Sequence, residues 1–267
     1  MARRGTFITT ATLEMTDLLV HDDDGAEGDT GAAGATFRAV ARSGSKFRQN
    51  VALAETAAVL AGYLYLLGHR RDSPEGGWSV PEDDAGGGAL RFWLLASYGV
   101  AYILRVNVMM RCLLSREVAM EEILFVLPVF VAGLMASFAL GGTGCDADIS
   151  VGAAVGSASL YAGGSYLNSG SELERKRWKK RPENKGKCYT VGLFSLARNI
   201  NYFGDVVLFS GWACGTGRWW NAWVPLVMLA GFVFHHIPEK EAYLAKRYAA
   251  QWPQYKARTK ALIPFIY

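Results

Sequence analysis

The sequence predicts an all-α membrane protein, a polytopic bundle of about six transmembrane helices that follows a disordered N-terminal tail. Hydrophobic residues make up 51% of the 267 residues and charged residues only 19%, which is low for a globular protein. The apolar stretches approach the roughly 20 residues that a transmembrane helix needs. Short segments rich in Lys and Arg separate these stretches, as expected for loops at a membrane surface.

The first 50 residues contain no apolar run long enough for a transmembrane helix or a signal-peptide core. Residues 21–34 read HDDDGAEGDTGAAG, a composition typical of disorder. We therefore expect a disordered tail over residues 1–50 and a transmembrane domain over residues 51–267. An organelle transit peptide is the alternative; Arg3 and Arg4 favour it, whereas Asp22 and Glu27 argue against it.

Six apolar segments follow along the chain. The fourth is rich in Gly, Ala and Ser, which is typical of a helix packed closely against its neighbours. The fifth needs its flanking residues to cross a bilayer. The segments cover residues 51–68, 90–110, 123–142, 151–167, 203–214 and 223–237.

The basic residues indicate the orientation of these helices. If all six segments cross the membrane, the loop with the sequence ERKRWKKRPENKGK, residues 174–187, lies on the same side as both termini. The loop on the opposite side at residues 72–88 is acidic and reads DSPEGGWSVPEDDAGGG. Because basic loops stay on the cytoplasmic side, both termini are predicted to be cytosolic.

Several classes of function are disfavoured. The four cysteines lie far apart without a His at metal-ligand spacing, so no metal site is expected. The basic residues are confined to loops between apolar segments, which gives no support to nucleic-acid binding. The glycines of GDTGAAGAT, residues 28–36, follow no strand, so they are not a dinucleotide-binding fingerprint.

Two features could carry chemistry. The cationic array that follows the fourth segment matches a ligand with several phosphates, or it is a loop that lies beside anionic lipid headgroups. Glu55 is an ionisable side chain within the first apolar segment and is therefore a functional candidate. The alternative for Glu55 is simple access to water near the cytosolic end of its helix.

Two motifs in the last hundred residues carry a resemblance to a known family. Residues 192–205 read GLFSLARNINYFGD, and residues 260–267 read KALIPFIY. They resemble the signature and the C-terminus of the steroid 5α-reductase and sterol reductase family, over residues 168–267. The resemblance implies an integral membrane enzyme of the endoplasmic reticulum that uses NADPH.

The resemblance also implies site residues. The stretch YILRVNVMMRCLLSR, residues 102–116, is similar to a family segment that contains an aromatic residue and two arginines. Tyr102 would face the substrate carbonyl, with Glu55 as its acidic partner. The family has Arg and His on its last helix where this chain has His235 and Glu239. The positions implied to bind the cofactor are Arg105, Arg116, Asn168, Glu172, Lys179, Asn201, Asp205, His235 and Tyr243.

The resulting hypothesis is a membrane-embedded reductase that transfers hydride from NADPH to a C=C bond of a steroid, sterol or other enone or enoyl lipid. Its partners are the bilayer and a hydrophobic lipid substrate. An S-adenosylmethionine-dependent membrane methyltransferase that resembles isoprenylcysteine methyltransferases is one alternative, and a non-catalytic lipid-binding relative is another. The sequence NYFGD from Asn201 to Asp205 favours the reductase.

Overall fold

A computed structural model describes residues 32–69, 89–113, 127–143 and 149–267. These residues are helical apart from short turns and one isolated parallel bridge between Ala197 and Lys260. The main helices are α2 (Ala32–Gly68), α3 (Ala89–Val108), α4 (Leu127–Thr143), α5 (Val151–Ser165), α6 (Ser171–Lys179), α7 (Ile200–Thr216), α8 (Trp223–Gly231), α9 (Ile237–Arg247) and α10 (Trp252–Arg258). Wider π-helical turns extend α3 and join α5 to α6 and α8 to α9, at Met109–Leu113, Tyr166–Gly170 and Phe232–His236.

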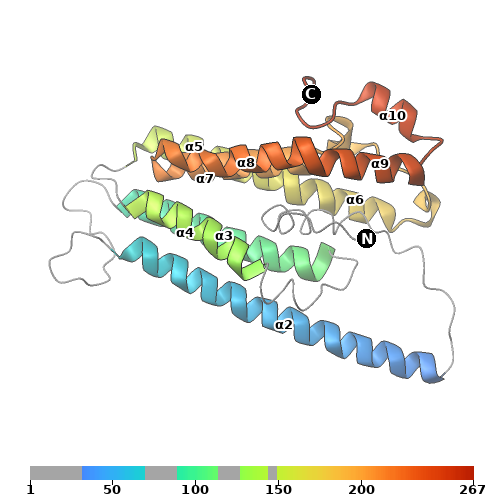
Figure 1. Cartoon of the computed structure of the whole chain (residues 1–267), viewed down its shortest axis with the longest axis horizontal. Coiled ribbons are helices and arrows are strands. Elements are labelled where there is room, and N and C mark those ends of the chain that lie inside the picture. Colours follow the sequence, from blue (N-terminus) through green and yellow to red (C-terminus); the bar gives the residue numbers. More distant parts are fainter. Residues whose placement is uncertain (1–31, 70–88, 114–126, 144–148) are drawn as a thin grey trace, which may run out of the picture.

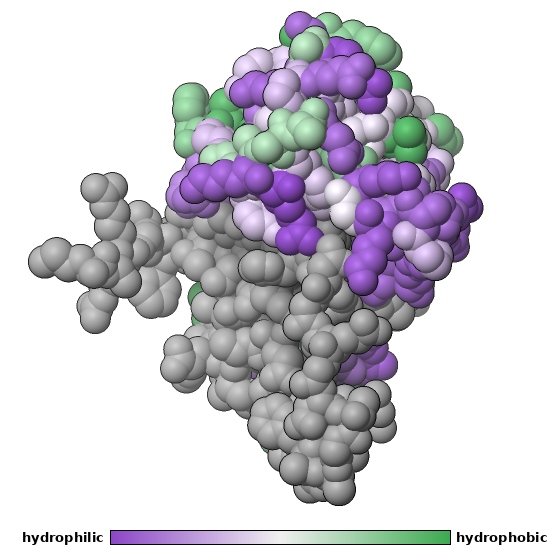
Figure 2. Space-filling view, turned by 90° about the vertical axis from the view of Figure 1, so that its right-hand side faces the viewer, coloured by the Kyte–Doolittle hydropathy of each residue, from purple (hydrophilic) through white to green (hydrophobic). Residues whose placement is uncertain are grey.

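The long helices lie roughly parallel to one axis (Figure 1). Helices α5, α7 and α8 form one side of the bundle, α3 and α4 lie in the middle, and α2 lies on the opposite side. Helices α6, α9 and α10 gather at one end together with the C-terminus. Viewed from this end, the described surface is largely hydrophilic (Figure 2). Helix α6 and the residues that follow it carry exposed cations, among them Arg177, Lys180 and Arg181.

The prediction of an all-α membrane bundle is confirmed. Among the described residues, three helices are long and apolar enough to cross a membrane: Gln49–Gly68, Ala89–Arg111 and Trp219–Arg247. Val129–Thr143 is a shorter apolar helix. The fourth and fifth predicted segments form α5 and α7, which have 15 and 17 residues.

The structure changes the predicted boundary of the N-terminal tail. Helix α2 begins at Ala32, so residues 32–50 belong to a helix rather than to a disordered tail. These residues are rich in Ala, Arg and Ser, and their polarity concealed a helix that continues into the first apolar segment. Residues 1–31 lie outside the described residues.

Helices α5 and α7 pack with their backbones in close contact. A Cβ atom added at Gly164 would come within 2.3 Å of the backbone nitrogen of Leu208, and one at Gly204 within 2.4 Å of the backbone nitrogen of Asn168. Gly211 is equally restricted by Tyr161. Small residues allow helices in a bilayer to approach in this way. The contact explains Gly164 of the fourth apolar segment and brings Asn168 next to α7.

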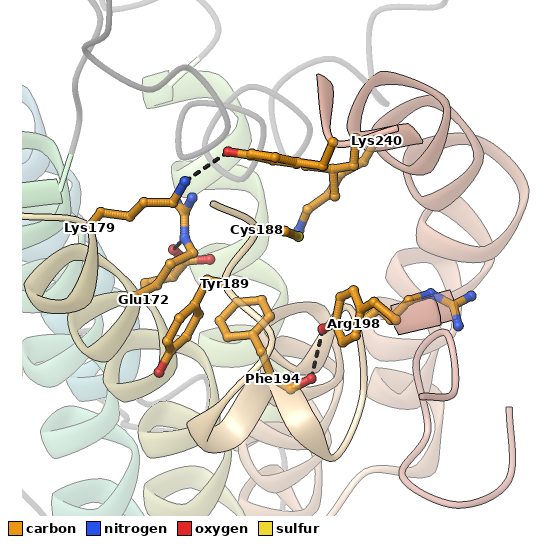
Figure 3. Close-up of a pocket in the computed structure, with 11 residues that line it drawn as sticks. Glu172, Lys179, Cys188, Tyr189, Phe194, Arg198 and Lys240 are labelled. Carbon is orange, nitrogen blue, oxygen red and sulfur yellow. Dashed lines mark hydrogen bonds and ion pairs between the residues drawn. The ribbon is translucent and has the colours of Figure 1, made fainter. Parts of the chain in front are cut away.

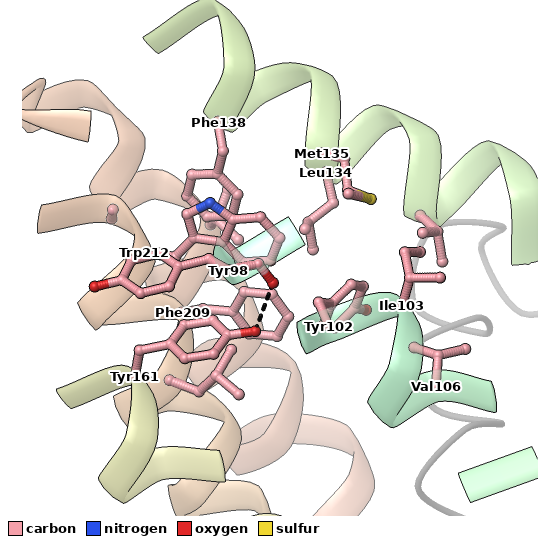
Figure 4. Close-up of a cluster of buried hydrophobic side chains, with 14 of the residues drawn as sticks. Tyr98, Tyr102, Ile103, Val106, Leu134, Met135, Phe138, Tyr161, Phe209 and Trp212 are labelled. Carbon is pink, nitrogen blue, oxygen red and sulfur yellow. Dashed lines mark hydrogen bonds between the residues drawn. The ribbon is translucent and has the colours of Figure 1, made fainter. Parts of the chain in front are cut away.

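The middle of the bundle is an aromatic core (Figure 4). Trp212 of α7 stacks on Phe138 of α4, with ring centroids 4.8 Å apart. Tyr98 of α3 stacks on Tyr161 of α5 at 4.2 Å, and the Tyr98 hydroxyl hydrogen-bonds with Ser157 at 2.8 Å. Tyr102 lies in the same cluster. This packing holds α3, α4, α5 and α7 in a defined register.

The C-terminal segment is anchored to the start of α7. The backbone nitrogens of Arg198 and Asn199 donate to the carbonyls of Lys260 and Ala261 at 2.9 and 3.0 Å. The Arg198 guanidinium also donates to the carbonyls of Lys256 and Thr259 and pairs with Glu241 of α9. Helices α9 and α10 are thereby fixed against the polar end of the bundle.

Candidate functional site

A buried polar network joins three of the residues implied to bind the cofactor. Nη1 of Arg105, on α3, donates to Oδ1 of Asn168 at 2.9 Å and to Oδ1 of Asp205 at 3.1 Å. Nδ2 of Asn168 donates to the other carboxylate oxygen of Asp205 at 2.8 Å. Asn168 lies on the π turn before α6, and Asp205 on α7. The fold therefore assembles side chains that are up to 100 residues apart.

Asn201 lies one helical turn before Asp205 and is fully buried. Its backbone carbonyl accepts from Asn168 at 3.1 Å. Neither its side-chain oxygen nor its side-chain nitrogen has a hydrogen-bond partner among the described residues. A buried amide without partners is unfavourable, so this position suits a ligand that offers both a donor and an acceptor.

A pocket opens at the polar end of the bundle, between α6, α9, α10 and the segment before α7 (Figure 3). Four cationic side chains and one carboxylate line it. The full lining is Glu172, Arg175, Lys179, Cys188, Tyr189, Phe194, Arg198, Lys240, Leu244, Tyr248 and Tyr255. The pocket thus includes Glu172 and Lys179 from the predicted set.

Hydrogen bonds hold these charged groups in place. Arg175 Nε donates to Glu172 Oε2 at 2.8 Å. Lys179 Nζ donates to the Tyr248 hydroxyl at 2.8 Å and to the Lys187 carbonyl at 2.9 Å. Even with Glu241, which pairs with Arg198, the four cations outnumber the two carboxylates, so the surroundings of the pocket carry an excess of positive charge and favour an anionic ligand.

Tyr189 and Tyr255 of the pocket are kept neutral by their surroundings. Burial raises the pKa of Tyr255, and its hydroxyl donates to the Phe194 carbonyl at 2.7 Å. Burial and the nearby Glu174 carboxylate raise the pKa of Tyr189. Both phenols therefore act as uncharged donors or packing groups, and the positive charge of the lining is not offset by phenolate.

Arg198 and Lys240 are pocket residues that the sequence analysis missed. Lys240 is buried, and its ammonium lies 4.4 Å from the ring centroid of Tyr202. A signal for Lys240 existed, because Ile237, Lys240 and Leu244 share one face of a helix and place a cation in an apolar stripe. Arg198 precedes α7 in an irregular turn, where no periodicity points to it.

The predicted catalytic pair lies on neighbouring helices. Tyr102 is buried and packs edge-on against Phe209 and Trp212. The Arg105 guanidinium lies over the Tyr102 ring, 5.3 Å from the ring centroid. Glu55 is on α2, and its Oε2 is buried without a hydrogen-bond partner among the described residues. No described hydrogen bond joins Glu55 with Tyr102. The structure connects Tyr102 with the polar network through Arg105, whereas Glu55 remains separate.

The remaining predicted residues lie elsewhere. His235 faces Glu239, with 3.7 Å between Nδ1 and Oε1, and the Tyr243 hydroxyl accepts from Arg247 Nη1 at 2.9 Å. Neither His235 nor Tyr243 lines the pocket. Arg116 lies outside the described residues.

The fold and the site define an all-helical membrane protein with a buried polar network beside a cationic pocket. The chain belongs to the family described as protein of unknown function DUF1295, whose model matches residues 122–259, about half of the chain. That range includes the pocket and the predicted site residues from Asn168 to Tyr243. Glu55, Tyr102, Arg105 and Arg116 precede it.

One curated relative is a probable O-methyltransferase, ustE, of Ustilaginoidea virens. It is 35% identical to this chain over 89 residues, a match that covers 33% of this chain and 31% of the relative. The match thus spans about a third of the length of that protein.

Proposed function

We propose that this protein is a membrane-embedded reductase that binds NADPH and delivers hydride to a C=C bond of a steroid, sterol or other enone or enoyl lipid. The observation that carries the proposal is the charge of the pocket. Four cations and one carboxylate line it, which suits the phosphates of NADPH. S-adenosylmethionine carries a sulfonium, an ammonium and a single carboxylate, so it gains less from such a lining.

The buried polar residues fit the uncharged parts of the same cofactor. The Asn201 side chain offers a donor and an acceptor without described partners, a match for the carboxamide of nicotinamide or for ribose hydroxyls. Asn168, Asp205 and Arg105 are fixed by their mutual hydrogen bonds. Asn168 also donates to the Asn201 backbone and so holds that residue in place. Lys179, Arg175, Arg198 and Lys240 are the residues for the phosphates, and Glu172 orients Arg175.

NADPH, when bound, supplies the hydride; the chain must polarise the carbonyl of the acceptor. The Tyr102 hydroxyl is the proposed donor to that oxygen, because negative charge develops there during the reaction. Its ring is fixed by Phe209 and Trp212, so the donor is preorganised. Glu55 is proposed to supply the proton.

Isotope transfer tests the reaction. Purified protein in detergent is incubated with NADPH deuterated at nicotinamide C4 and a panel of enone steroids, sterols and enoyl lipids. We expect deuterium at the β-carbon of the reduced product, and a loss of turnover of about 10²–10³-fold in Tyr102→Phe with unchanged NADPH affinity. Wild-type turnover in Tyr102→Phe would show that the Tyr102 hydroxyl has no role in the reaction.

A methyltransferase is the second candidate, because the curated relative is named a probable O-methyltransferase. The same incubation with methyl-labelled S-adenosylmethionine examines it. If a labelled methyl group appears on an acceptor and no deuterium is transferred from NADPH, the protein is a methyltransferase and the reductase proposal is wrong.

A further inference from the structure

The junction of α8 and α9 carries a cluster of metal-ligating side chains outside the pocket. A π-helical turn at Phe232–His236 joins the two helices. Such turns often occur at functional positions, because the extra residue redirects the side chains around it. Here the sequence His235-His236-Ile237-Pro238-Glu239 places two histidines at the end of the turn and a carboxylate in the next one.

The three side chains converge. A ring nitrogen of His235, a ring nitrogen of His236 and a carboxylate oxygen of Glu239 all lie within 4.8 Å of one another. The Nδ1 atom of His235 is 3.7 Å from Oε1 of Glu239, and the two imidazole rings are 4.9 Å apart. Ligands of a tetrahedral zinc ion lie about 3.4 Å apart, as bond lengths of about 2.1 Å require. The His235 and Glu239 side chains are 46% and 58% exposed. Both can therefore rotate and bring the ligand atoms from their present separation to the spacing that zinc requires.

An independent observation points to a ligand. His236 is only 2% exposed, and its Nδ1 has no hydrogen-bond partner among the described residues. A buried imidazole nitrogen without a partner is unusual. Neutral imidazole nitrogen is also the commonest metal ligand in proteins. A cation held by the His236 ring and its two exposed neighbours would give this buried side chain a partner.

We propose that His235, His236 and Glu239 bind one divalent transition-metal ion, with Zn²⁺ as the best match. Two imidazoles and a carboxylate are a recognised zinc ligand set, and three protein ligands leave a fourth position for water. The ion fixes the junction between α8 and α9. Its ligand Glu239 directly precedes Lys240 of the pocket. The site does not depend on the identity of the ligand in that pocket.

Titration with Co²⁺ and Zn²⁺ tests the site. The full chain is purified without a polyhistidine tag, treated with EDTA and dialysed. Four- or five-coordinate Co²⁺ absorbs visible light strongly, whereas hydrated Co²⁺ does not, so absorption reports binding and Zn²⁺ competition gives the affinity. We expect one saturable ion per chain, displaced by Zn²⁺.

The variants use exposed positions, so that folding is preserved. His235→Ala and Glu239→Gln should each weaken Zn²⁺ binding at least about tenfold, while the control His69→Ala, directly after α2 and outside the cluster, should leave it unchanged. The proposal is overturned if the wild type binds no ion at one per chain. It is equally overturned if the two site variants match the wild type, or if His69→Ala weakens binding as much as they do.

Discussion

At the scale of single residues, the pair of Arg105 and Asp205 is the most consequential interaction. Their side chains are 12% and 7% exposed, so both charges have lost most of their hydration. The attraction between them and the bonds to Asn168 offset this desolvation. Such a pair adds little net stability, yet removing one member leaves the other charge buried alone. Its role is therefore to fix the positions of Asn168 and Asp205 next to Asn201.

The first residue prediction follows from this asymmetry. Asp205→Leu leaves Arg105 without its counter-charge and should lower the free energy of unfolding by about 3–5 kcal/mol. The double variant Arg105→Met with Asp205→Leu should recover most of that loss, because both charges are gone. Unfolding titrations with dodecyl sulfate in mixed micelles measure the difference. A double variant as unstable as the single one would show that the pair is not electrostatically coupled.

At the scale of helices, the contact of α5 with α7 positions the site. The backbones approach so closely that Gly164 and Gly204 leave no room for a side chain. Asn168 follows α5 by one π turn, and Asp205 follows Gly204 directly. The distance between these two polar side chains is therefore set by the glycine contact, because Gly164 lies about one turn before Asn168 and Gly204 is next to Asp205. A wider spacing of the helices would break the network before it disturbed the aromatic core.

Two adjacent glycines of α5 provide a matched test of this contact. Gly164→Ala would place Cβ within 2.3 Å of the Leu208 backbone, so it should destabilise the protein by about 1–3 kcal/mol. Gly163 has no atom within 4 Å of the added Cβ, and Gly163→Ala should be neutral or raise stability by up to about 1 kcal/mol. Thermal unfolding in detergent compares them. Equal effects of the two substitutions would contradict the packing.

At the scale of the whole molecule, the apolar pattern predicted the bundle, and three residues that the resemblance implies to bind the cofactor meet in a buried polar network. Arg105, Asn168 and Asp205 were named from motifs and meet in space. Arg198 was missed because its neighbours in the pocket come from α6, α9 and α10, whose packing no local pattern encodes. Lys240 was missed although its position between Ile237 and Leu244 on one face of α9 gave a local signal. The start of α2 at Ala32 was missed because a helix that leaves the membrane has no apolar periodicity to follow.

The basic end of the molecule predicts its orientation. Exposed cations of α6 and of the residues after it, such as Arg177 and Lys180, lie at the end that carries the pocket and the C-terminus, so we propose that this end faces the cytosol. An epitope after Tyr267 should be accessible when only the plasma membrane is permeabilised, whereas one inserted at Gly217 should need full permeabilisation. The reverse pattern would invert the topology.

The most direct measurement of the central claim is equilibrium binding of the two cofactors. Purified protein in detergent is titrated by calorimetry with NADPH and, separately, with S-adenosylmethionine. We predict saturable binding of NADPH at one per chain, at least about tenfold tighter than that of S-adenosylmethionine. Asn201→Ala should weaken NADPH binding by about 1–3 kcal/mol, while Asn184→Ala, at a buried asparagine whose amide already donates to the Trp178 carbonyl, should not. Tighter binding of S-adenosylmethionine, or NADPH binding unaffected by Asn201→Ala, would contradict the account.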